Sequence, residues 1–250
     1  GSKGEGIIAG IIDSGLNPAN PSFADSVSED DGGDGYDHTN PLGAGNYLGM
    51  CNPDNTAGNP KYVADWGCND KLIGYYNFTN DGDVYDDDGH GSHTGSTTAV
   101  NKVRVTTYAG TGENEFSTTE TISGVAPHAN VIGYDVCDGC CSMSAIVAAI
   151  DQAITDGVNV INYSIGSAAA SDAWNDPDAI GFLNARAAGI HVATSAGNDG
   201  PGAETLGSPA DVPWITSVGA TQHDRQWQAK VTDISADCAT HPDISGVAFA

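Results

Sequence analysis

The chain has 250 residues, with 33 acidic side chains against 8 Lys and Arg, so its formal net charge is −25. A protein this acidic repels DNA, RNA and anionic membrane surfaces, so we expect no nucleic-acid partner. No apolar run reaches the roughly 18 residues that cross a bilayer, so we expect no membrane insertion either.

Apolar and small-residue segments alternate along the chain in a regular way. Short β-branched runs predict strands, and runs with apolar residues on one face predict helices. The irregular, Asn-, Asp- and Gly-rich stretch 17–60 is predicted to be a surface excursion. In chain order we expect strands at 6–12, 71–78, 131–136, 158–163, 190–194 and 214–218, with helices beginning near 90, 142 and 176.

Local signals mark the helix ends. Ser142 or Ser144 can cap the helix that Gly157 closes, and Asp176-Pro177 opens a helix that ends near Gly189. Strands that alternate with helices of this length predict an α/β fold: a doubly wound, mostly parallel sheet with helices on both faces. Ligands of such sheets bind beyond the carboxyl ends of the strands.

Three polar motifs stand at positions suited to that edge. Asp13 follows an apolar strand in Asp13-Ser14-Gly15, His90 opens a small-residue helix in His90-Gly91-Ser92-His93, and Asn198 follows a strand in Ala196-Gly197-Asn198. Taken singly, each motif is more often a turn, a cap or a structural histidine than a catalytic residue.

Taken together and in this order, the motifs resemble those of the subtilisin-like serine proteases, the subtilases. The segment from Trp66 to Gly74, the helix and strand between 146 and 161, and the segments 195–202 and 213–220 are similar to the plant cucumisin-like branch and a related bacterial branch. The resemblance covers roughly residues 5 to 225. It implies the subtilisin-like α/β fold and a serine endopeptidase that acts on polypeptide substrates.

The resemblance also implies roles for individual residues. His90 is expected to be the general base, Asp13 to hold its imidazole, and Asn198 to donate to the oxyanion. Ser164, Ile165 and Gly166 resemble the strand that pairs with the substrate backbone. Ser195, Ala196 and Gly197 resemble one wall of the primary specificity pocket. No metal is expected at the site, and no cofactor.

One element of the family pattern is missing from these residues. The nucleophile motif G-T-S-M-A does not occur; Ser142-Met143-Ser144 precedes the wrong helix, and Ser195 and Ser208 match no nucleophile position. We therefore expect a catalytic domain truncated before its serine, inactive by itself. Residues 1–225 would be its N-terminal part, and 226–250 would begin the connection to a further region, such as the protease-associated domain often inserted in this branch. The alternative is a pseudoprotease that binds extended peptides at Ser164–Gly166 without cleaving them.

The remaining expectations concern the environment of the protein. Six cysteines in an acidic chain favour an oxidising, extracellular location over reduced cysteines in the cytoplasm. The resemblance implies disulfides Cys51–Cys68 and Cys137–Cys141, with Cys140 and Cys238 paired or free, and an N-terminal propeptide in the precursor. The acidic run 80–88 could hold calcium, although it lacks the EF-hand register and a solvated loop is the simpler interpretation.

Overall fold

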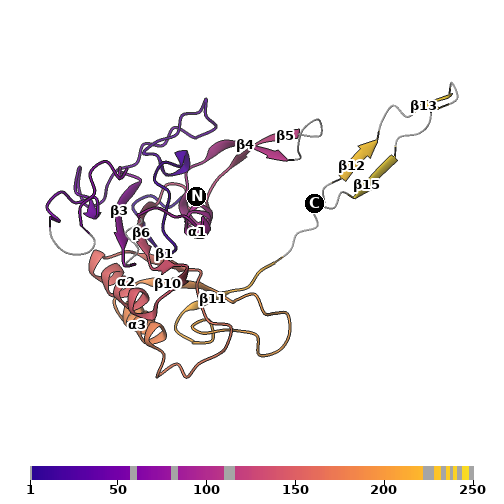
Figure 1. Ribbon diagram of the computed structural model, residues 1–250. Coiled ribbons are helices and arrows are strands. Elements are labelled where there is room, and N and C mark those ends of the chain that lie inside the picture. Colours follow the sequence, from indigo (N-terminus) through magenta and orange to yellow (C-terminus); the bar gives the residue numbers. More distant parts are fainter. Residues whose placement is uncertain are drawn as a thin grey trace. The chain divides into compact units, whose positions relative to one another are not determined.

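The computed structural model describes residues 2–56, 61–79, 84–109 and 116–221, and the backbone of short strands between 228 and 247. The chain divides into two units, Gly1–Gly219 and Ala220–Ala250. The first unit carries all of the motifs singled out above, and its arrangement is shown in Figure 1.

A seven-stranded sheet forms the centre of the first unit. Its strand order is β11-β10-β9-β1-β6-β3-β2, and every neighbouring pair is parallel. The strands are β1 (Ile8–Asp13), β2 (Leu48–Gly49), β3 (Leu72–Asn77), β6 (Asn130–Asp135), β9 (Val160–Tyr163), β10 (His191–Ser195) and β11 (Thr216–Val218). The predicted mostly parallel α/β sheet is confirmed.

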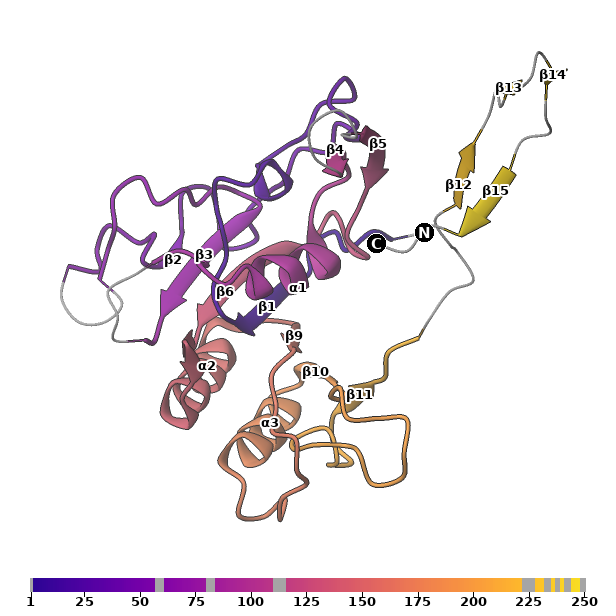
Figure 2. The same cartoon turned by 45° about the vertical axis from the view of Figure 1, so that its right-hand side comes forward.

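Helices cover both faces of this sheet. Helix α1 (His90–Ala99) lies on one face, and α2 (Met143–Asp156) and α3 (Pro177–Ala187) lie on the other (Figure 2). The Ser142 side chain caps α2 by accepting from the Ala145 N–H, and Gly157 ends that helix in a left-handed conformation. These local signals explain why the predicted helix positions are confirmed.

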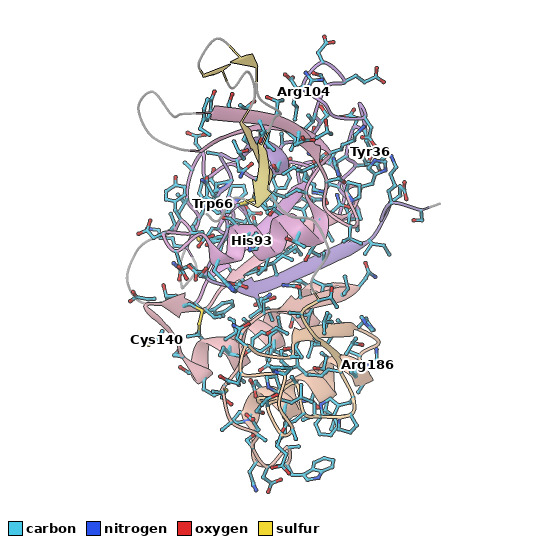
Figure 3. All side chains as sticks on the ribbon, turned by 90° about the vertical axis from the view of Figure 1, so that its right-hand side faces the viewer. Tyr36, Trp66, His93, Arg104, Cys140 and Arg186 are labelled. Carbon is cyan, nitrogen blue, oxygen red and sulfur yellow. A yellow bond between two sulfur atoms is a disulfide. The ribbon has the colours of Figure 1, made fainter. Side chains whose placement is uncertain are left out.

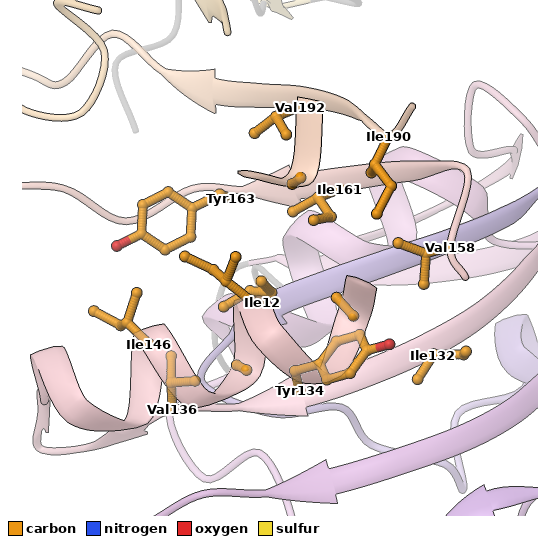
Figure 4. Close-up of a cluster of buried hydrophobic side chains, with 14 of the residues drawn as sticks. Ile12, Ile132, Tyr134, Val136, Ile146, Val158, Ile161, Tyr163, Ile190 and Val192 are labelled. Atoms are coloured by element: carbon orange, nitrogen blue, oxygen red, sulfur yellow. The ribbon is translucent and has the colours of Figure 1, made fainter. Parts of the chain in front are cut away.

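The two faces of the sheet carry separate hydrophobic clusters, because successive side chains of a strand point to opposite faces. On β1, Ile12 packs into the cluster on the α2 and α3 side, and Ile11 packs into the cluster on the α1 side. Figure 4 shows Ile12 in the first cluster, close to Tyr134 of β6, Ile146 of α2 and Tyr163 of β9. β1 and β6 are buried at every position, which is why short, nearly continuous apolar runs in the sequence predicted them.

Three segments depart from the sequence interpretation. In the stretch 17–60, the described residues 17–56 are largely irregular, with a 3₁₀ turn at Pro21–Phe23 and the short strand β2. They are not all surface, because Phe23 and Met50 are fully buried. We did not predict the hairpin of β4 (Val103–Ala109) and β5 (Phe116–Ile122), or the short hairpin of β7 (Cys137–Asp138) and β8 (Cys140–Cys141). Both hairpins are antiparallel. Figure 3 shows Arg104 on the first and Cys140 on the second.

In the second unit, the described strands form antiparallel pairs. β12 (Gln228–Val231) pairs with β15 (Ile244–Val247), and β13 (Ser235–Ala236) pairs with β14 (Ala239–Thr240). Within the described parts of the chain, no helix has the length and apolar character needed to cross a membrane.

Candidate functional site

The carboxyl ends of three adjacent strands bring the predicted polar segments together. Ile12 of β1 pairs with Tyr163 of β9, which in turn pairs with Thr194 of β10. Asp13, the segment that begins at Ser164, and Ser195 therefore leave the sheet side by side. This is the edge at which ligands of doubly wound sheets bind.

Asp13 is in contact with His90, the first residue of helix α1. Asp13 is 1% exposed, and its Oδ1 lies 2.6 Å from Nδ1 of His90. The Ser14 N–H also donates to Oδ1, and the Thr94 hydroxyl donates to Oδ2 at 2.9 Å. Both oxygens of the carboxylate are thus held, and its orientation toward the imidazole is set by the surrounding structure.

Thr94 was not among the residues that we predicted for the site. It lies four positions after His90 on α1, so the two side chains share one helix face, and both reach Asp13. That i, i+4 spacing was the available signal in the sequence.

The electrostatic surroundings raise the pKa of His90. The hydrogen bond that the imidazole donates to Asp13 is the largest cause. Burial partly opposes it, and the negative charges of Asp13, Asp88 and Asp86 add to it. The imidazole is not enclosed, since 47% of its side chain is exposed. His90 is therefore oriented by a buried carboxylate, and its imidazole is accessible from solvent.

Helix α1 approaches the loop that follows strand β1 so closely that only glycine fits at the contact. A Cβ on Gly91 would stand 2.1 Å from the carbonyl oxygen of Gly15. The Gly91 N–H donates to Ser14 Oγ at 2.9 Å. This contact sets the distance between Asp13 on the strand and His90 on the helix.

Asp86 supports the same junction, and sequence reasoning missed it. The N-cap residue Gly89 has no side chain to cap α1. Instead, Asp86 accepts from the Gly89 and Ser92 N–H groups, and from the Ser14 hydroxyl at 2.9 Å. A carboxylate satisfies helix N-terminal donors well, so an acidic residue shortly before the predicted helix was the signal.

An open cleft of about 740 Å³ lies over this edge of the sheet. It places Asp13, His90 and Asn198 along one cavity together with most of the predicted substrate-binding residues. Ala196 does not line it. The described lining residues that were predicted as substrate contacts are Ser164, Ile165, Gly166, Ser195 and Gly197.

Acidic side chains, rather than basic ones, provide the charge in this cleft. Asp87, Asp88 and Asp199 line it, whereas the described lining residues include no Lys or Arg. The cleft therefore presents a negative field to any molecule that enters it.

Four of the cysteines form two disulfides. Cys51 pairs with Cys68, and Cys137 pairs with Cys141, as the resemblance implied. Cys140 is free and exposed, and Figure 3 shows it beside the second disulfide. Cys238 lies outside the described residues.

Residues 80–83 of the suggested calcium loop lie outside the described residues. Within the ranges that are described, no group of three or more His, Cys, Asp and Glu side chains is arranged to hold a metal ion. Asp86 is engaged with N–H and hydroxyl donors of the α1 junction, which is a structural use of that carboxylate.

Comparison with known sequences links this site to a family. The sequence model of the subtilase family matches residues 4–248 of the chain. The chain is 37% identical to the subtilisin-like protease SBT4.13 of Arabidopsis thaliana over 90% of its own length and 27% of the relative's. It is 37% identical to SBT4.3 and 34% identical to SBT2.1 of the same plant, and it covers 28% and 27% of those relatives. The chain thus spans about a quarter of the length of the curated relatives it matches.

Proposed function

The chain belongs to the subtilase family, and from that premise we propose that it supplies most of the catalytic groups of a serine endopeptidase. The observation that carries the proposal is the 2.6 Å contact between His90 and the buried Asp13 at the end of an open cleft. In a serine protease, an imidazole held by a carboxylate takes the proton of the nucleophile.

The contact assigns a chemical task to each nitrogen of His90. Nδ1 donates its proton to Asp13, which leaves the lone pair of Nε2 available to accept a proton from a serine hydroxyl. The Asp13 carboxylate stabilises the imidazolium that forms, and the imidazolium then protonates the leaving amine.

We assign the remaining roles by position in the cleft. The side-chain amide of Asn198 donates to the oxyanion of the tetrahedral intermediate. Ser164, Ile165 and Gly166 pair with the extended substrate backbone, and Ser195, Ala196 and Gly197 border the pocket for the substrate side chain. These assignments are supported by the lining of the cleft, which contains all of these residues except Ala196.

The nucleophile in this proposal is a serine outside the 250 residues, because no serine here stands in the family's nucleophile motif. The chain expressed by itself is therefore expected to hydrolyse no protein. We further propose that the protein acts outside the cell, since its two disulfides persist in an oxidising environment. A propeptide in the precursor remains part of the proposal.

The test uses the full-length protein that contains this chain, with casein as substrate. His90→Ala is expected to lower kcat by about 10⁶-fold, the size of the loss in subtilisin itself, and a serine-reactive inhibitor is expected to abolish hydrolysis. The matched control is His93→Ala, an exposed histidine one turn along the same helix, which should retain activity.

A second function is favoured by the missing nucleophile motif: a peptide-binding module that does not cleave. If the folded full-length protein binds casein at the cleft but releases no fragments, the endopeptidase proposal fails and the binding module is supported. Hydrolysis that survives in His90→Ala would contradict the assigned mechanism.

A further inference from the structure

Asp176 stands at the N-cap of α3 but does not cap the helix. No hydrogen bond joins its side chain to the first N–H groups of α3. Instead, Oδ2 of Asp176 accepts hydrogen bonds from the Ser171 and Ser208 hydroxyls, whose oxygens lie 2.9 Å apart. Asp176 is 8% exposed and Ser208 is 4% exposed, whereas Ser171 lies at the surface.

The two serines belong to two adjoining segments, which are called the cleft walls here. Ser171 lies just beyond the stretch Ser164–Ala168, which lines the cleft, and Ser208 lines the cleft together with Gly207. The backbones of the walls also pair: the Ser167 N–H donates to the Ser208 carbonyl at 2.9 Å. At Gly207, a Cβ would stand 1.7 Å from the Ser167 carbonyl oxygen, so the walls touch. Asp176 accepts a hydrogen bond from a serine of each wall and thereby joins the two.

A second carboxyl group, that of Asp178, shares this position. Asp178 is 4% exposed and hydrogen-bonds to Asp176, to the Ala179 N–H at 2.8 Å and to the Tyr163 hydroxyl at 3.3 Å. Tyr163 is the last residue of β9, immediately before the wall segment that begins at Ser164.

The surroundings of the pair favour a proton on Asp178 rather than on Asp176. Burial, the hydrogen bond to Asp176 and the charge of Asp176 raise the pKa of Asp178 to about 7. Burial also raises the pKa of Asp176, but hydrogen bonds from Asp178, Ser171 and Ser208 outweigh it and bring that pKa below its ordinary value. Asp178 thus holds the proton and donates it toward the Asp176 carboxylate.

The charged and titratable groups around the pair are few. Tyr163 from β9 and the two carboxyls of α3 face one another, and burial and the charge of Asp178 raise the pKa of Tyr163. Ser171 and Ser208 face Asp176 from the wall segments, and they do not titrate in this range. Among the described residues, no Lys, Arg or His forms a salt bridge with Asp176 or Asp178.

We propose that Asp176 and Asp178 act as positioning residues that hold the two cleft walls in place through one shared proton, so that peptide binding weakens when that proton is lost. The proposal rests on the proposed function for the identity of the cleft. When Asp178 ionises, two buried carboxylates face each other and Asp178 no longer donates to Asp176. Repulsion displaces the oxygen that accepts from Ser171 and Ser208, and both walls lose their fastening.

The experiment measures peptide binding separately from hydrolysis, in the full-length protein. The His90→Ala variant is titrated with dye-labelled casein from about pH 6 to about pH 8.5. We expect Kd to rise about tenfold over this range, as the loss of hydrogen bonds to a charged group predicts. In the unaltered protein, KM should rise in parallel, while kcat, which depends on His90, should not fall.

Three variants separate positioning from a general structural effect. Asp178→Asn keeps a hydrogen-bond donor without a titrating proton, so its Kd is expected to stay low and independent of pH. Ser171→Ala removes one fastening and should raise Kd at all pH values. Asp172→Asn, an exposed aspartate nearby that bonds the Trp174 N–H and Asn175, is the control and should keep the pH dependence.

A third readout tests the proton without any ligand. We expect the infrared band of a hydrogen-bonded carboxylic acid below neutral pH, and we expect it to vanish above neutral pH. The band should be missing in Asp178→Asn. A Kd that does not change with pH, or Asp178→Asn with the pH dependence of the unaltered protein, overturns the inference while casein hydrolysis leaves the endopeptidase proposal standing. If casein is not hydrolysed, but the infrared band and the pH-dependent Kd are present, the endopeptidase proposal fails and this inference stands.

Discussion

At the scale of single residues, the carboxylate of Asp13 is held on both of its oxygens. His90, Ser14 and Thr94 all bond to it, so its two oxygens have little freedom to rotate. Sequence motifs identified Asp13 and His90 as candidates, because each belongs to a short local pattern. Thr94 was missed because its partner Asp13 lies far away in the sequence. Asp86 was missed because its bond to Ser14 is equally remote, although its other partners, Gly89 and Ser92, are near.

The acidic residue Asp88 provides a test of the electrostatics at this scale. The negative charge of Asp88 is one cause that raises the pKa of His90. Asp88→Asn removes that charge, so the imidazole loses its proton at lower pH. Because the general base must be neutral, the acidic limb of kcat against pH should move to lower pH by a few tenths of a unit, and more at low salt.

The control for this prediction is Asp151→Asn, on the exposed side of helix α2. Asp151 is not among the charges that act on His90, so its removal should leave the acidic limb in place. A limb that moves equally in both variants would show that only net charge matters.

At the scale of elements, the contact between α1 and β1 decides the geometry of the site. The helix begins with the base, and its second residue lies against the loop that follows the strand. Sequence patterns located both elements, but they said nothing about the distance between them. The hairpin of β4 and β5 escaped sequence reasoning because its Thr-rich strands carry no continuous apolar run.

Gly91→Ala is expected to disturb this contact. A methyl group 2.1 Å from the Gly15 carbonyl forces helix and strand apart, so the free energy of unfolding should fall by about 1–3 kcal/mol and activity should fall with it. Denaturant unfolding and casein hydrolysis measure the two effects. Gly219→Ala, whose Cβ would meet nothing within 4 Å, should be neutral, and an equal loss there would reject the explanation.

The disulfide Cys51–Cys68 fixes the irregular segment to the core. Its cysteines are 17 residues apart, and Cys51 is buried. Replacing both with Ala releases the loop in the unfolded chain, which should lower the free energy of unfolding by about 3 kcal/mol. A thermal melt checks this, and a melting temperature equal to that of the unaltered protein would show that the bond contributes no stability.

At the scale of the whole molecule, the net charge of −25 and the acidic cleft act in the same direction. Long-range attraction should draw cationic peptides to the protein and slow the approach of anionic ones. This property could be expected from composition for the surface as a whole. Its presence in the cleft depended on where Asp87, Asp88 and Asp199 came to lie.

Salt provides the corresponding measurement. When NaCl rises from about 10 mM to about 200 mM, the Debye length shortens from about 30 Å to less than about 8 Å. We therefore expect kcat/KM for a Lys-rich peptide to fall several-fold and that for an uncharged peptide of equal length to stay constant. A parallel fall for both peptides would point to an effect of salt on the fold.

The sequence by itself determined the alternation of strands and helices, the ends of α2 and the order of the Asp13, His90 and Asn198 motifs. These features depend on periodicity, capping and short patterns, which are properties of neighbouring residues. Only the tertiary structure decided that Asp86 fastens Ser14 to α1, and that Asp176 joins Ser171 to Ser208. Each depends on side chains brought together from separate parts of the chain by burial of the two clusters on the sheet, and no local pattern records such a contact.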